Sequence, residues 1–161
     1  PFVLAHALGY RRLRRVYWGG FTGAAFSNPV QRLGSRLAQV VPVDPDRGII
    51  TSLALAAAVL RSGRTLVWFP EGARSRNGRL QPLKPGIGLL LEQYPVEVVP
   101  IAIDGTYELM PTGRALPRPG RVRIEIGSPV AADTLNEEGE GTDRRGRIIA
   151  GLERRLRSMV R

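Results

Sequence analysis

Short apolar runs alternate along the chain with segments whose apolar residues recur at helical spacing. We predict strands at residues 13–18, 40–43, 65–69, 96–103 and 122–126. We predict helices at residues 2–8, 21–39, 49–60, 85–93 and 148–159. This order indicates an α/β fold: a single domain over residues 1–161, with a mostly parallel central sheet flanked by helices and a C-terminal amphipathic helix.

The end of the chain divides into two predicted parts. Residues 131–142 are rich in acidic residues and glycine and are predicted to be a linker, and residues 143–161 contain the C-terminal helix. The apolar stripe of that helix comprises Ile148, Leu152, Leu156 and Met159. Two interpretations stay open: the stripe packs on the core of its own domain, or the helix lies on an anionic membrane surface with its arginines toward the headgroups.

Composition excludes several kinds of site. The 161 residues are 43% hydrophobic and 24% charged, which is typical of a globular chain. There is no cysteine and one histidine, His6, so thiolate chemistry and a multi-histidine metal site are excluded. The longest apolar run, residues 53–60, is too short to cross a bilayer, and no signal peptide is visible. We therefore expect no transmembrane helix.

The charge is strongly basic, with 24 Lys and Arg against 14 Asp and Glu, a net charge of +10. Nucleic acid, an anionic membrane and small phosphate-bearing substrates are all compatible partners. Aromatic residues make up 6% and do not interleave with the arginines as base-stacking platforms would require. A basic nucleic-acid-binding module is therefore the alternative, and no nucleic-acid partner is predicted.

An arginine-rich loop, FPEGARSRNGRL, follows the predicted strand at 65–69 and contains Glu71, Gly72 and Arg74. Ligands of open α/β sheets bind beyond the carboxyl ends of strands, and the planar guanidinium of Arg74 suits a phosphate. Glu71 is expected to pair with Arg74 or to hydrogen-bond a substrate hydroxyl. Gly72 would let backbone N–H groups approach a ligand. The alternative is a solvated turn with surface arginines.

A second basic position, Arg47 in VDPDRG, follows the predicted strand at 40–43. The alternative here is a proline turn with a surface arginine. Asp44 and Asp46 have no third ligand nearby, so no metal site is predicted.

These segments together resemble the glycerolipid acyltransferases, the family of bacterial 1-acylglycerol-3-phosphate acyltransferases. Residues 69–75 are similar to its F-P-E-G-T-R-S block, with Ala73 in place of threonine. Lys84-Pro85-Gly86 resembles the F-K-x-G continuation, and residues 98–103 resemble the fourth block. VVPVDPDRG resembles the second block, although Pro45 departs from it. The resemblance covers roughly residues 1–130 and implies an acceptor-phosphate site made of Arg47, Phe69, Pro70, Glu71, Gly72, Ala73, Arg74 and Ser75.

The catalytic H-x-x-x-x-D pair of that family has no counterpart here, because Arg11 stands five residues after His6. PFVLAHAL resembles the helix that follows the catalytic aspartate. We therefore expect the histidine and aspartate just upstream of Pro1, and we expect the fragment itself to be inactive. A catalytically dead homologue is the alternative if that segment is not H-x-x-x-x-D.

The resemblance implies acyl transfer in phospholipid biosynthesis. The donor would be acyl-CoA or acyl-carrier protein, and the acceptor a hydroxyl of a lysophospholipid or glycerol phosphate. No cofactor or metal is expected. An anionic membrane surface is the expected partner, and the expected location is peripheral, at the cytoplasmic face of the membrane.

Overall fold

A computed structural model describes residues 2–21, 33, 35, 37–43, 49–111 and 116–160. It divides into two compact units, residues 1–69 and 70–161. Each unit is described by itself. The single domain expected over the whole chain therefore stays a prediction.

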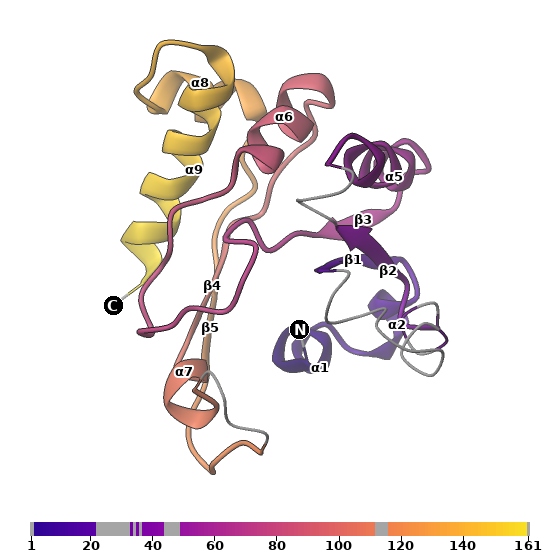
Figure 1. The fold of residues 1–161 in the computed structure, drawn as a ribbon, viewed down its shortest axis with the longest axis vertical. Helices are drawn as coiled ribbons and strands as arrows, with labels where there is room; N and C mark the ends of the chain where they lie inside the picture. The colour runs from indigo at the N-terminus through magenta and orange to yellow at the C-terminus, as the bar shows by residue number, and fades with distance from the viewer. Residues whose placement is uncertain are drawn as a thin grey trace. The chain divides into compact units, whose positions relative to one another are not determined.

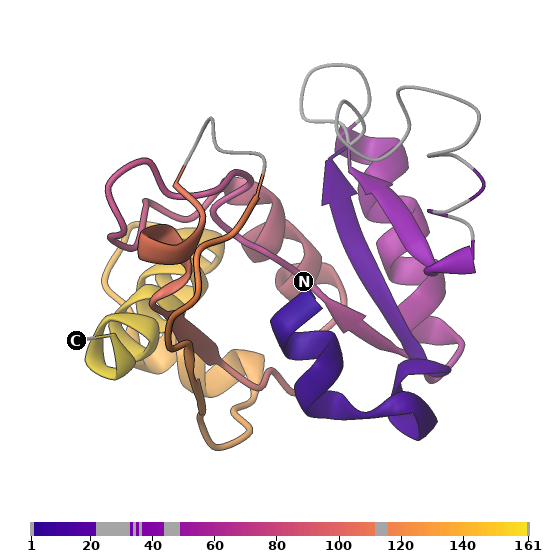
Figure 2. The ribbon, with the colours of Figure 1, turned by 90° about the horizontal axis from the view of Figure 1, so that it is seen from below.

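The first unit contains a parallel three-stranded sheet in the order β2-β1-β3. Its strands are β1 (Val16–Phe21), β2 (Val40–Val43) and β3 (Thr65–Val67). Within the described residues, its helices are α1 (Phe2–Leu8), α2 (Tyr10–Leu13) and α5 (Ile49–Arg61). The helix α5 packs on β2 and β3 (Figure 2). Because all three strands are parallel, the segments that follow β2 and β3 leave the same edge of the sheet.

A local feature at Gln39 fixes the chain just before β2. Gln39 has a φ of 57°, and its side-chain Nε2 donates to the carbonyl oxygens of Leu13 and Val16 at 3.0 and 3.1 Å. These bonds hold the chain beside β1 just before β2 begins. Among the described residues of this unit, the buried apolar side chains come from α1, β1, β2 and α5: Leu4, Val16, Val41, Leu53, Ala56 and Ala57.

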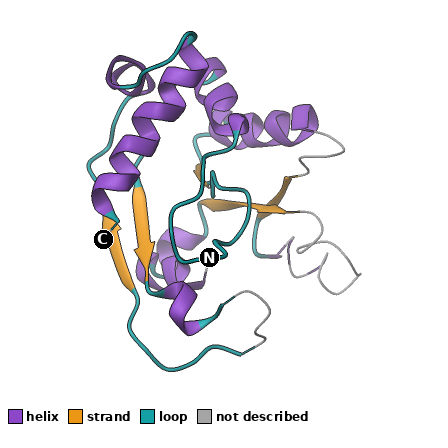
Figure 3. Cartoon of the chain, turned by 60° about the vertical axis from the view of Figure 1, so that its left-hand side comes forward, coloured by secondary structure: helices purple, strands orange, loops and turns teal. Residues whose placement is uncertain are grey.

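The second unit contains a two-stranded antiparallel sheet of β4 (Ile101–Asp104) and β5 (Arg123–Ile126). Its helices are α6 (Pro85–Gln93), α7 (Thr106–Leu109), α8 (Ala132–Glu138) and α9 (Arg144–Met159). In Figure 1, α9 lies beside α8 and α6, and Figure 3 shows it alongside the antiparallel strands. The core of this unit therefore lies under α9.

Close packing of α6 on α9 depends on a glycine. A Cβ at Gly88 would lie 2.7 Å from Ile149 Cδ1 and 2.8 Å from Arg145 Cγ. The apolar stripe predicted for α9 is buried, with Ile148 at 0% exposure and Leu152 at 4%. The stripe therefore packs within its own unit, and the interpretation in which it lies on a membrane is not the arrangement found.

The predicted α/β class, the parallel sheet flanked by helices and the C-terminal helix are confirmed. One local prediction is wrong, and another is correct only in part. The segment 131–142, expected to be a linker, contains α8, whose Leu135 is fully buried. The strand expected at 96–103 begins at Ile101 and pairs antiparallel with β5 in a separate sheet. Most of the helix expected at 21–39 lies outside the described residues.

Candidate functional site

The arginine-rich loop begins where the parallel sheet ends. β3 ends at Val67, and residues 68–84 contain no helix or strand until α6 begins at Pro85. All the predicted site residues from Phe69 to Ser75 lie in this segment. The remaining one, Arg47, lies outside the described residues, so its pairing with Arg74 around one phosphate stays a prediction.

The boundary between the two units divides the predicted block. Phe69 is the last residue of the first unit, and Pro70 is the first residue of the second. Both side chains are half-buried, whereas Ala73 is exposed. The geometry of the site that can be described is therefore that of residues 70–84.

The base of the loop is closed by a main-chain bond. The backbone N–H of Lys84 donates to the carbonyl oxygen of Pro70 at 2.8 Å, which brings the two ends of the loop together. Gly72 has a φ of +74°, and a Cβ there would lie 3.3 Å from Lys84 Cγ. The stem of Lys84 therefore packs over Gly72, in a backbone conformation that glycine adopts without strain.

Glu71 is held by the main chain. Its Oε2 accepts from the backbone N–H of Gln81 at 2.7 Å. Burial raises the pKa of the Glu71 carboxyl above its ordinary value, and the bond from Gln81 opposes that rise without cancelling it. Within the described residues Glu71 forms no ion pair with Arg74, so the expected pairing of these two side chains is not found.

The turn that carries the arginines is tied by Ser75, a predicted site residue, and by Asn77 and Gln81, which the sequence did not single out. Ser75 Oγ donates to the carbonyl oxygen of Arg79 at 2.8 Å. Asn77 Oδ1 accepts from the backbone N–H of Arg79 and from Gln81 Nε2, each at 3.1 Å. The Asn77-Gly78 dipeptide was the available signal, because this pair favours tight turns.

The three arginines of this loop, Arg74, Arg76 and Arg79, are all exposed. In the part of the chain that the structure describes, none of their guanidinium groups has a carboxylate partner. An exposed guanidinium without an internal partner can offer its N–H groups to an external anion, and a phosphate fits its planar fork.

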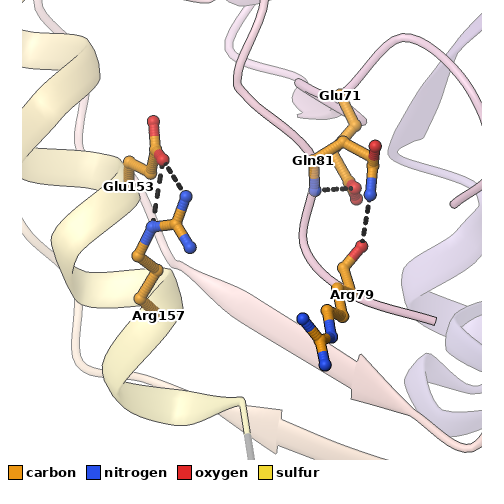
Figure 4. Close-up of polar contacts among 5 residues, drawn as sticks. All are labelled: Glu71, Arg79, Gln81, Glu153 and Arg157. Atoms are coloured by element: carbon orange, nitrogen blue, oxygen red, sulfur yellow. Dashed lines mark hydrogen bonds and ion pairs between the residues drawn. The ribbon is translucent and has the colours of Figure 1, made fainter. Parts of the chain in front are cut away.

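The arginines of α9 differ from those of the loop. Five of them form ion pairs with carboxylates of the second unit: Arg144, Arg145, Arg154, Arg155 and Arg157. Figure 4 shows the pair of Arg157 with Glu153 on this helix. Bonding to Glu138 raises the pKa of Arg155, and the same bond lowers the pKa of the Glu138 carboxyl. Among the described residues, the arginines of the loop therefore differ from five of the arginines of α9, whose guanidinium groups already have carboxylate partners.

The remaining predictions about chemical groups concern His6 and metals. His6 lies on α1 with an exposed side chain. No group of three or more potential metal-ligating side chains occurs among the described residues. Among the same residues, no helix has the length and apolar character needed to cross a membrane.

Comparisons with known proteins find related sequences. The family model described as Acyltransferase matches residues 1–104. The 1-acyl-sn-glycerol-3-phosphate acyltransferase BAT2 of Brassica napus is 36% identical over 120 residues, which is 70% of this chain and 35% of that protein. The mouse 1-acyl-sn-glycerol-3-phosphate acyltransferase alpha is 28% identical over 129 residues, which is 78% of this chain and 42% of that protein.

A solved structure also matches. The 1-acyl-sn-glycerophosphate acyltransferase PlsC of Thermotoga maritima is 26% identical, with a TM-score of 0.69, and the match covers 90% of this chain and 55% of that one. This chain spans about a third of the length of the plant relatives it matches. With the family model covering more than half of the chain, and with the loop 69–75 in the position described, the chain belongs to the acyltransferase family.

Proposed function

We propose that the protein carrying this chain transfers a fatty acyl group from an acyl thioester to a hydroxyl of a lysophospholipid or glycerol phosphate, in phospholipid biosynthesis. The observation that carries the proposal is Arg74, exposed in the F-P-E-G block and without a carboxylate partner among the described residues. The names of the relatives, which are 1-acyl-sn-glycerol-3-phosphate acyltransferases, support this acceptor class.

The reaction needs a base, because a hydroxyl is a weak nucleophile near neutral pH. As the acceptor oxygen attacks the thioester carbonyl, its proton passes to the base. The carbon–sulfur bond then breaks, and the thiolate of the donor leaves and takes up a proton. We expect a histidine of an H-x-x-x-x-D segment outside residues 1–161 to act as the base, oriented by the aspartate. The donor is acyl-CoA or acyl-carrier protein, and no cofactor or metal takes part.

The residues of this chain would act on the acceptor. Arg74 binds the acceptor phosphate with its guanidinium, and Arg47 provides a second cation from the segment after β2. Binding the phosphate places the hydroxyl near the base, which raises the rate through positioning. Glu71, fixed by the backbone N–H of Gln81, orders the loop or accepts a hydrogen bond from a hydroxyl of the acceptor.

Steady-state kinetics of Arg74 variants test this role, in the protein that includes the H-x-x-x-x-D segment. We expect Arg74→Ala to raise the acceptor KM by roughly ten- to hundredfold, the range for losing a hydrogen bond to a charged group, and to leave the thioester KM nearly unchanged. Arg74→Lys should also be impaired, because lysine lacks the planar fork.

Arg64→Ala is the matched control. Arg64 is also exposed and unpaired within the described residues, but it precedes β3, whereas Arg74 follows it. The control should change neither KM. Equal increases of both KM values in Arg74→Ala would contradict a phosphate-binding role.

We also propose that the loop contacts an anionic membrane at its cytoplasmic face, through Arg76 and Arg79. The support is that both side chains are exposed and lack carboxylate partners in the described residues, while five arginines of α9 are paired. A basic residue near an anionic surface contributes about 1 kcal/mol, so replacing both by glutamine should weaken binding to phosphatidylglycerol-containing vesicles roughly 30-fold.

The control pair is Arg154→Gln with Arg157→Gln, two paired arginines of α9 with the same total change of charge. Vesicle co-sedimentation should show a much smaller effect for the control. Equal losses for the two double variants would contradict a specific role of the loop. Tight, steeply salt-dependent binding to DNA or RNA would favour the nucleic-acid alternative.

A further inference from the structure

Gln81 connects the start of the arginine-rich loop, at Glu71, to the turn that contains Arg79. Its backbone N–H donates to Glu71 Oε2 at 2.7 Å, and its side-chain Nε2 donates to the carbonyl oxygen of Arg79 at 2.9 Å. Figure 4 shows both bonds, with Gln81 between the other two residues. One residue therefore joins the carboxylate of the F-P-E-G block to the turn that follows it.

The same side chain also reaches the interior of the turn. Gln81 Nε2 lies 3.1 Å from Asn77 Oδ1 and 3.5 Å from Ser75 Oγ. Ser75 Oγ and Asn77 Oδ1 in turn bond the main chain of Arg79. Residues 70–84 contain no helix or strand, so their main chain lacks regular hydrogen bonding. These side-chain bonds therefore hold the conformation of the loop in its place. Without the amide of Gln81, the turn would keep only its internal bonds.

We propose that Gln81 is a positioning residue of the acceptor site. It sets the separation of Glu71 from the turn that carries Arg74, Arg76 and Arg79, so that the arginines meet the acceptor phosphate from an ordered backbone. This inference rests on the proposed function. Fixing a loop before the ligand arrives reduces the conformational entropy that binding must remove.

The chemistry of the position is specific. The two bonds to Arg79 and Asn77 need an N–H donor, and both acceptors are neutral oxygens. Glutamate has nearly the same shape but no donor when ionised, and it would place a second carboxylate near Glu71. Alanine lacks the polar group altogether. Both replacements keep the backbone N–H, so they test the side chain alone.

The first measurement is backbone hydrogen exchange in the protein that includes the H-x-x-x-x-D segment. In Gln81→Ala and Gln81→Glu we expect the amide of Arg79, which is bonded to Asn77 Oδ1, to exchange roughly tenfold faster, the range for losing one or two neutral hydrogen bonds. The control is Gln93→Ala, an exposed glutamine at the end of α6. It should leave exchange at Arg79 unchanged. Unchanged exchange in the Gln81 variants would overturn the proposal.

The second measurement separates positioning from a general structural role. With lysophosphatidate as acceptor, we expect the Gln81 variants to raise the acceptor KM by roughly tenfold with the thioester KM unchanged, because only phosphate binding depends on the turn. Equal changes of both KM values, or a fall in kcat alone, would overturn the positioning role. A wild-type protein inactive on all glycerol-phosphate acceptors would overturn the proposed function and the acceptor role of Gln81. In that case the exchange rates still decide whether Gln81 holds the turn.

Discussion

The backbone N–H of Gln81 donates to Glu71 Oε2 over 2.7 Å, so the carboxylate of the F-P-E-G block is bound by a main-chain donor ten residues away. Two opposing influences act on this carboxyl group. Burial disfavours its charge, and the N–H group favours it. Burial is the larger of the two, which gives the pH dependence of stability at this position a definite sign.

We expect Glu71 to make the protein less stable as the pH rises through mildly acidic values. Its pKa is higher in the folded than in the unfolded state, where it is near 4.5. Between these two values the folded state binds more protons, so the free energy of unfolding falls with rising pH. Glu71→Gln keeps an oxygen that can accept from Gln81 but does not titrate. The free energy of unfolding of wild type minus that of the variant should therefore decrease from pH 4 to pH 7.

Denaturant unfolding of both proteins at several pH values measures this difference directly. In this difference, the contributions of the other carboxyl groups to the pH dependence cancel. They include that of Glu138, whose lowered pKa makes the free energy of unfolding rise with pH. A difference that increases with pH would mean that the bond from Gln81 outweighs the burial of the carboxyl group.

Gly72→Ala should cost both stability and acceptor binding. The φ of +74° at Gly72 disfavours any residue with a Cβ by about 1–2 kcal/mol. The added Cβ would also lie 3.3 Å from Lys84 Cγ and force that side chain to shift. We therefore expect a lower free energy of unfolding and a higher acceptor KM.

Gly63→Ala is the matched control for this variant. Gly63 has a similar φ of +67°, but a Cβ there would meet nothing within 4 Å. The control should lose a similar amount of stability, measured by denaturant unfolding, and keep the wild-type acceptor KM. A raised acceptor KM in both variants would mean that general destabilisation, and not the packing of Lys84, is responsible.

The sequence predicted the loop well because its motif is local. The strand before the loop and the start of α6 at Pro85 follow from neighbouring residues, although β3 ends at Val67 and not at residue 69. The partner of Glu71 did not follow, because Arg74 is the nearest cation along the chain while Gln81 reaches Glu71 only after the loop has closed through the Lys84–Pro70 bond. Local sequence patterns do not predict contacts that form only when a loop closes.

The helix α8 was missed for a related reason. Its sequence ADTLNEE is polar apart from Ala132 and Leu135, and glycines follow it, so composition alone indicates a linker. The structure buries Leu135 completely, and a Cβ at Gly151 of α9 would lie 2.2 Å from the carbonyl oxygen of Leu135. Tertiary packing on α9 therefore decides the conformation of this segment.

Leu135→Ala tests whether α8 is part of the core. Removing a fully buried leucine side chain leaves a cavity and should lower the free energy of unfolding by about 2–5 kcal/mol. Leu116→Ala is the control, because Leu116 is 75% exposed, and surface substitutions change stability by only about 0.5 kcal/mol. Thermal or denaturant unfolding distinguishes the two. A loss below 1 kcal/mol for Leu135→Ala would support the linker interpretation instead.

Asp143 is expected to stabilise the start of α9 as its N-cap. Its Oδ1 accepts from the backbone N–H of Gly146 at 2.8 Å, which satisfies a donor that has no partner within the helix. Asp143→Ala should therefore lower the free energy of unfolding by about 1 kcal/mol, whereas Asp143→Asn, which keeps an acceptor oxygen, should lose much less. Thr142→Ala, the exposed neighbour, is the control for a general effect of substitution here.

Hydrogen exchange shows where the stability is lost. Because α9 packs on α6 and α8, fraying at its first turn would loosen the second unit near Arg144 and Arg145. Faster exchange at Gly146 in Asp143→Ala alone would localise the loss to the cap. If Asp143→Asn lost as much stability as Asp143→Ala, the charge of Asp143 at the positive end of the helix dipole, and not the hydrogen bond, would be the stabilising feature.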